Sequence, residues 1–167
     1  MRARRAALPG SAAAPAVQRT IARSFTLTGQ GVHGGRPAGM TLAPAGADVG
    51  IVFSVAGAEI EAHWSRVDAS NLRTRLAGDG ANVSTVEHLM AALAALDVDN
   101  AVVLLDGDEV PAMDGSARDF VLAIDEVGVV ALPAPRRALR VVKPTRVSDG
   151  AGWAELRPAN AGLHLDV

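Results

Sequence analysis

The sequence predicts a two-layer α+β domain in which two helices pack on a small, mostly antiparallel sheet. Three observations support this prediction. Short segments that alternate apolar and polar residues recur in the first half of the chain and are typical of strands. Two later segments, which begin near Val83 and Ser116, carry apolar residues at helical spacing. Between them, the apolar run Ala101–Leu105 indicates a central, well-buried strand.

Composition narrows the classes of function. The 167 residues can hold one ordinary domain, or one domain and part of another. A formal net charge of -2, 3% aromatic residues and no tyrosine argue against a nucleic-acid-binding protein. The chain has no cysteine, so any metal must be held by histidines and carboxylates. No apolar run is long enough to span a bilayer.

The chain is expected to begin with a disordered tail, residues 1–17. Three arginines near the N-terminus resemble the start of a signal peptide, but prolines and a glycine interrupt the segment that should be apolar. The first domain is predicted to span residues 18–131, and His63 and Trp64 in it are expected to be packing and surface residues. Its early strands are expected at Arg19–Thr28, Met40–Leu42, Gly50–Val55, Glu59–Trp64 and Asn71–Leu76.

A glycine-rich loop, Gly29–Gly35, follows the first predicted strand. Four glycines in its seven residues, GQGVHGG, indicate a backbone with positive φ or a close approach to another group. It is not a phosphate-binding loop of the Walker type, because the Lys-Ser/Thr pair is missing and no helix pattern follows. His33 at its centre is either a turn residue or a group presented to a site.

The most informative segment is the predicted helix Val83–Leu96. Ser84 and Glu87 form the S-x-x-E pattern of a capping box. His88 stands in the first turn, off the apolar stripe that packing requires. An imidazole can hold a metal while a neighbouring carboxylate takes a proton from water. The alternative is that Glu87 only closes the capping box and His88 is a surface residue.

The second helix and the residues after it complete the predicted organisation. Ser116 or Asp114 is expected to cap this helix, and Gly128 to end it. Residues 132–137, LPAPRR, have the composition of a linker. Residues 138–167 predict a hairpin around Asp149-Gly150, followed by a strand, GLHLDV, without a helix to cover them. They are expected to be the incomplete start of a second domain.

The motifs GQGVHGG, STVEHLMAAL and EVPAMDGSARDF, in this order, resemble the zinc-dependent UDP-3-O-acyl-N-acetylglucosamine deacetylase family. The resemblance runs from about Gln18 to Val167 and includes DGAGWAELRP. It implies two similar domains, each a small sheet with two helices, and an active site between them. It also implies a cytoplasmic enzyme that hydrolyses the N-acetyl group of UDP-3-O-(3-hydroxyacyl)-GlcNAc in lipid A biosynthesis, the route to lipopolysaccharide.

The resemblance implies roles for particular residues. His88 matches a zinc ligand, and Glu87 matches the general base. In that mechanism Zn²⁺ polarises the acetamide carbonyl and acidifies the attacking water, whose proton Glu87 accepts. Residues matched to the substrate cleft are Val32, His33, Asn71, Leu72 and Arg73.

The sequence also departs from the family pattern. Many members carry a cysteine where this chain has Arg73. The other two zinc ligands and the general acid have no match, so the chain is expected to be an N-terminal part that is inactive alone. His164 and Asp166 match no ligand and are interpreted as ordinary strand residues. The alternative is a non-catalytic interaction module or a decayed gene fragment. A continuation encoding H-x-x-x-D and a further histidine would favour the enzyme.

Overall fold

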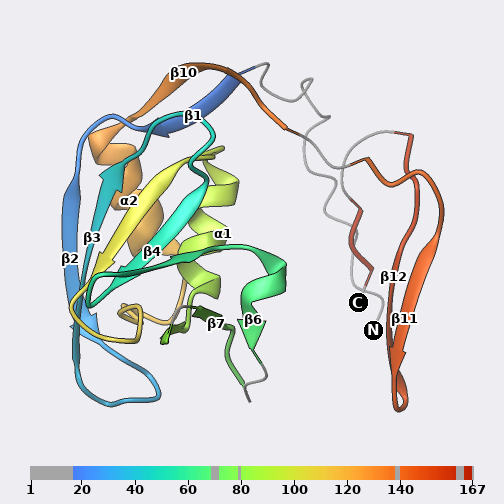
Figure 1. Cartoon of the computed structure of the whole chain (residues 1–167), viewed down its shortest axis with the longest axis horizontal. Coiled ribbons are helices and arrows are strands. Elements are labelled where there is room, and N and C mark those ends of the chain that lie inside the picture. The colour runs from blue at the N-terminus through green and yellow to red at the C-terminus, as the bar shows by residue number, and fades with distance from the viewer. Residues whose placement is uncertain (1–16, 69–71, 79, 138–139, 161–163, 167) are drawn as a thin grey trace. The chain divides into compact units, whose positions relative to one another are not determined.

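A five-stranded sheet lies at the centre of the first unit of the chain, Val17–Pro135 (Figure 1). The computed structural model describes residues 17–68, 72–78, 80–137, 140–160 and 164–166. The strand order is β2-β3-β9-β4-β5, and only the β4–β9 pair is parallel. The strands are β2 (Phe25–Gln30), β3 (Pro37–Pro44), β4 (Ile51–Val55), β5 (Ala58–Glu61) and β9 (Ala101–Leu105). The predicted α+β class with a mostly antiparallel sheet is confirmed.

One face of this sheet is buried in the core, and the other is mostly exposed or half-buried and carries both polar residues and the apolar Leu104, which is 46% exposed. Strand β9 has the predicted bounds and is paired on both sides, with β3 and β4. Leu42, Phe53 and Val103 are fully buried and belong to one continuous core. On the opposite face the hydroxyls of Thr26 and Thr41 lie 2.8 Å apart at an exposed position. This alternation follows from the two-residue period of a strand.

Two helices supply the second layer. Helix α1 (Glu87–Ala95) buries Leu89 and Leu93, and helix α2 (Arg118–Val127) buries Phe120 and Ile124. All four side chains join the core formed by the sheet. Burying an aliphatic or aromatic side chain of this size contributes about 1.5–3 kcal/mol. The helix with ten residues, α2, is the longer, so no helix in the described part of the chain is long enough to cross a membrane.

The start of α1 differs from the predicted capping box. Ser84 is the last residue of strand β8 (Ala81–Ser84), where its N–H donates to the Asp108 carbonyl at 2.8 Å. Thr85 then adopts a φ of 62°, and α1 begins at Glu87 with no side-chain cap. The predicted capping box was wrong because sheet pairing fixes the Ser84 backbone, and the helix begins only three residues later, at Glu87.

The start of α2 is closer to the prediction. The N-cap position is Ala117, but the Ser116 hydroxyl accepts a hydrogen bond from the Arg118 N–H at 3.1 Å. Asp114 in turn accepts bonds from the N–H and hydroxyl of Ser116. At the other end Gly128 closes the helix with a φ of 81°, as the sequence predicted.

A smaller three-stranded sheet leads into α1. Its order is β6-β7-β8, with β6 at Val67–Asp68 and β7 at Arg75–Gly78. The strand predicted at Glu59–Trp64 ends at Glu61, and a short 3₁₀ helix, Trp64–Arg66, follows. His63 caps this helix: its Nδ1 accepts from the Ser65 N–H at 3.3 Å. Trp64 is 78% exposed, so it is a surface residue, as expected.

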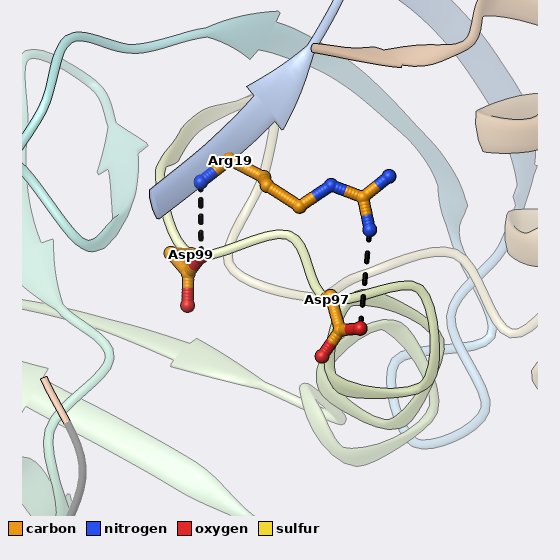
Figure 2. A network of polar contacts seen from close by, with 3 residues as sticks. All are labelled: Arg19, Asp97 and Asp99. Carbon is orange, nitrogen blue, oxygen red and sulfur yellow. Dashed lines mark hydrogen bonds and ion pairs between the residues drawn. The ribbon is translucent and has the colours of Figure 1, made fainter. Parts of the chain in front are cut away.

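The first and the last strand of the first unit pair with each other. Strand β1 (Val17–Ile21) pairs antiparallel with β10 (Val129–Pro135). Figure 2 shows how Arg19 joins β1 to the turn after α1. Its N–H donates to Asp99 Oδ2 at 2.9 Å, and its guanidinium lies 3.8 Å from Asp97 Oδ2. The strand predicted at Arg19–Thr28 is therefore wrong as one element: β1 ends at Ile21 and β2 begins at Phe25.

The segment predicted as a linker is partly a strand. Its first four residues, Leu132–Pro135, complete β10, and Pro135 pairs with Val17. Proline is tolerated there because a two-stranded ribbon leaves one side of each strand without a partner. The second unit, which contains Arg136–Val167, follows.

In the second unit the predicted hairpin is confirmed. Strands β11 (Thr145–Asp149) and β12 (Gly152–Leu156) pair around Asp149 and Gly150. The Arg146 guanidinium lies 4.1 Å from the centre of the Trp153 ring, a cation–π contact. Residues 164–166 are exposed and form no strand, so the predicted strand GLHLDV is wrong over this described portion. Residues 161–163 and 167 lie outside the described residues, as do residues 1–16 of the predicted tail.

Candidate active site

Helix α1 places two chemically capable side chains next to each other at its N-terminus. Glu87 and His88 are its first two residues, and both are half-buried. The position of the helix is fixed by Leu89 and Leu93, which are buried in the core. A carboxylate in the first turn is also favoured by the helix dipole. The predicted pair is therefore held on a packed element, at the end that favours negative charge.

The Glu87 carboxylate is oriented by the backbone of the loop before β7. Its Oε2 accepts a hydrogen bond from the Thr74 N–H at 3.1 Å. The Thr74 carbonyl accepts from the Thr85 N–H at 3.0 Å and from the Val86 N–H at 3.5 Å. Thr74 of the loop therefore both donates a hydrogen bond to the start of the helix and accepts hydrogen bonds from the residues just before it. The Oε1 oxygen accepts no hydrogen bond from the described residues.

His88 meets the requirements for one metal ligand. Its ring is half-buried and makes no hydrogen bond with the described residues. Imidazole is a common zinc ligand in proteins. Among the described residues, however, no group of three or more histidines and acidic residues is placed to hold a metal ion. The described residues therefore fit a single ligand with an adjacent proton acceptor, and they do not fit a complete zinc site.

The loop that precedes Thr74 carries the residues expected to contact substrate. Leu72 has a φ of 58° and a side chain that is 96% exposed. Arg73 is half-buried and adjoins Thr74, whose N–H holds Glu87. Chain connectivity therefore places Leu72 and Arg73 beside the carboxylate. The third predicted residue of this loop, Asn71, lies outside the described residues.

The glycine loop forms the tip of the β2–β3 hairpin. The Gly31 N–H donates to the Arg36 carbonyl at 2.9 Å, which closes the turn. Gly35 has a φ of 59°, so the predicted left-handed backbone is present. Both Val32 and His33 are exposed, Val32 by 60%. The loop therefore presents these two side chains to solvent.

A buried carboxylate that the sequence analysis missed lies beneath the glycine loop. Glu109 is only 8% exposed. Its Oε1 accepts from the His33 N–H at 3.0 Å and from the Thr85 hydroxyl at 2.9 Å, and its Oε2 accepts from the Gly34 N–H at 2.9 Å. Burial raises the pKa of Glu109, but these hydrogen bonds and the His33 ring outweigh burial and lower the pKa overall.

The close approach of the Glu109 carboxylate to the loop also explains why residue 31 is a glycine. A Cβ added at this glycine would collide with Glu109 Oε2 and lie 2.8 Å from its Cδ. The sequence shows four glycines in the loop but not which group approaches them. Glu109 itself stands in a short irregular segment without periodicity, so no local pattern indicated its role.

The structure thus gathers most of the predicted residues around one helix end. Hydrogen bonds connect Glu87 to the loop of Leu72 and Arg73, and they connect Thr85 through Glu109 to the loop of His33. The other predicted residues with metal-binding side chains, His164 and Asp166, belong to the second unit and are exposed there.

Comparisons with known proteins agree with these motifs. Residues 18–167 match the family model LpxC, described as UDP-3-O-acyl N-acetylglycosamine deacetylase. The chain is 48% identical over 156 residues to the UDP-3-O-acyl-N-acetylglucosamine deacetylases of Brucella ovis and Brucella canis. The same values hold for the enzyme of Brucella melitensis biotype 2. Each match covers 91% of this chain and 54% of the relative, so the chain spans about half the length of these relatives.

Proposed function

The chain belongs to the UDP-3-O-acyl N-acetylglycosamine deacetylase family, and from this membership we propose that it forms the N-terminal half of a zinc-dependent deacetylase. The proposed reaction is hydrolysis of the N-acetyl group of UDP-3-O-(3-hydroxyacyl)-GlcNAc in lipid A biosynthesis, in the cytoplasm. The observation that carries the proposal is the Glu87–His88 pair, in which a backbone N–H fixes the carboxylate and the adjacent ring has no partner among the described residues.

Glu87 is the proposed general base. The hydrogen bond from Thr74 holds Oε2, which leaves Oε1 to accept a proton from the attacking water. Orientation by a backbone N–H does not depend on a second side chain and is therefore rigid. Half-burial limits the competition of bulk water for this oxygen.

His88 is the proposed zinc ligand of this half. When bound, Zn²⁺ would polarise the amide carbonyl and acidify the attacking water. A catalytic zinc site normally has three protein ligands, and this part of the chain offers one. The remaining ligands and the general acid are proposed to come from a second domain. By this proposal the chain alone is inactive. The first domain corresponds to the unit Val17–Pro135, and the second is proposed to begin in the residues after it.

The exposed residues of the two loops are proposed to form the substrate cleft. Val32 and Leu72 offer apolar side chains to an acyl chain, because both are well exposed on loops bound to the start of α1. His33 and Asn71 are proposed to contact the polar sugar nucleotide. Arg73, where many family members carry cysteine, gives this wall a positive charge that can pair with phosphate.

A chimera tests the proposed function. It joins residues 18–167 to the part of the Brucella ovis relative that lies beyond the matched region. We expect this chimera to deacetylate the UDP-sugar in a zinc-dependent manner.

In this chimera, Glu87→Gln should lower kcat by about 10²–10⁴-fold, because the amide cannot accept the proton. Glu59→Gln, the same change at an exposed position of β5, is the matched control and should leave kcat unchanged. Turnover of the Glu87→Gln chimera within a few-fold of wild type would exclude the general-base role.

A further inference from the structure

We propose that Glu109 is a positioning residue, whose buried carboxylate holds the glycine loop of Val32 and His33 in a fixed orientation to the start of α1. The inference rests on the proposed function, because it concerns the same substrate cleft. Glu109 itself is too buried to contact substrate. It acts through the loop and through Thr85.

The backbone of the glycine loop faces the Glu109 carboxylate. The N–H groups of two successive residues, His33 and Gly34, point at separate oxygens of one carboxylate. Successive backbone N–H groups form a favourable concave site for an anion. Because the backbone donors point inward to Glu109, the side chains of Val32 and His33 are left on the exposed side. The carboxylate therefore sets which groups the loop presents.

Glu109 also connects the loop to the segment before α1. The Glu109 oxygen that accepts from His33 also accepts from the hydroxyl of Thr85, two residues before Glu87. Thr85 adopts a φ of 62°, which is unfavourable for a β-branched residue and needs support from its surroundings. The Glu109 carboxylate supplies part of that support, and so joins the loop to the segment that positions the general base.

The segment that carries Glu109 is itself held by backbone hydrogen bonds. The Asp108 carbonyl accepts from the Ser84 N–H at 2.8 Å, and the Val110 N–H donates to the Ser84 carbonyl at 3.1 Å. Two residues further on, the Ala112 N–H donates to the Gln30 carbonyl at 2.9 Å. The segment is thus bound to the strand that leads into α1 and to the strand that leads into the loop.

Closure of the hairpin turn does not explain the buried carboxylate. The hairpin turn is already closed by the hydrogen bonds from Gly31 to Arg36 and from Gly35 to Gly31. A buried carboxylate costs desolvation and is not needed to form a turn. Its distinct contribution is the orientation of the loop toward Thr85. Gly31 is required for this arrangement, because any side chain there would occupy the space of the carboxylate.

Amide hydrogen exchange on the 167-residue chain tests the physical part of the inference. In Glu109→Gln one side-chain oxygen becomes an NH₂ group that faces a backbone donor. We expect the amides of His33 and Gly34 to exchange about tenfold faster or more, while β9 amides are unchanged. Gly31→Ala keeps the charge and should produce the same loosening by displacing the carboxylate. Asp106→Asn is the matched control. It removes another carboxylate that accepts from a glycine N–H, at Gly39, and should not affect the loop.

Kinetics of the chimera test the functional part. Glu109→Gln and Gly31→Ala should each lower kcat/KM by about 10–100-fold, mainly through a higher KM, with zinc content unchanged. Loss of folded protein would instead lower apparent kcat at constant KM.

Unchanged exchange of the loop amides, or faster exchange with an unchanged KM, would overturn the inference. An inactive wild-type chimera would overturn the proposed function and the inference with it. An active wild type with unaltered Glu109→Gln kinetics would overturn the inference alone.

Discussion

At the scale of single residues, Glu87 and Glu109 show how two environments suit the same carboxylate group to different roles. Glu87 accepts one backbone hydrogen bond in the described structure and keeps an oxygen for chemistry. Glu109 accepts three hydrogen bonds and is almost fully buried. Hydrogen bonds that stabilise the charged form make a carboxylate a poor base, so the second glutamate is suited to holding structure.

The lowered pKa of Glu109 predicts a specific dependence of stability on pH. Since this pKa is lower in the folded chain than in the unfolded chain, the deprotonated carboxylate stabilises the fold. That contribution is complete above the unfolded pKa of a glutamate, 4.5, and is lost as pH falls through the folded value. Urea unfolding between pH 7 and pH 3 should show wild type losing more stability on acidification than Glu109→Gln. At neutral pH the variant should be less stable by about 1–3 kcal/mol. Parallel acid profiles for the two proteins would contradict the prediction.

At the scale of elements, the strands and turns that depend on neighbouring residues could be predicted from the sequence, and those that depend on distant residues could not. Strand β9 and the β11–β12 hairpin were predicted well because their signals, an apolar run and an Asp-Gly turn, are local. The start of α1 was predicted wrongly, because the Ser84 N–H donates to the carbonyl of the distant Asp108. The Glu87–His88 pair could be predicted from motif and residue type. Glu109 could not, since its two backbone donors are 75 and 76 residues away and its side-chain donor, Thr85, is 24 residues away.

The exposed hairpin predicts low protection from exchange. All but one residue of β11 and β12 is exposed, and a two-stranded hairpin is at best marginally stable in water. Amides of Thr145–Leu156 should therefore exchange orders of magnitude faster than those of β9, which is paired on both sides. Hydrogen exchange of the 167-residue chain provides the measurement. Equal protection in the hairpin and in β9 would mean that a second copy or another layer covers it.

At the scale of the whole molecule, no three metal-binding side chains lie together among the described residues, whereas a catalytic zinc site normally has three protein ligands. One half-buried imidazole cannot match the affinity of three ligands, so the proposal predicts weak zinc binding by the chain alone. After dialysis the purified chain should hold well under one zinc per molecule and show no deacetylase activity. The chimera should hold about one, and His88→Gln in the chimera should lower that content. Tightly held stoichiometric zinc with chelator-sensitive turnover in the chain alone would refute the proposal and redirect attention to His33, His164 and Asp166.

The pairing of the first strand with the last strand of the first unit has a consequence for synthesis on the ribosome. Gln18 contacts the Pro135 carbonyl across 117 residues, and Arg19 contacts Asp99 across 80. A chain made from its N-terminus cannot form the β1–β10 ribbon until residue 135 has left the exit tunnel. Through that interval β1 is an unpaired strand that other nascent chains can contact. Its partners between β3 and β4 emerge much earlier, since Ala45 donates to the Thr20 hydroxyl and Asp48 to the Gln18 side chain, and so they provide the first place where β1 can dock.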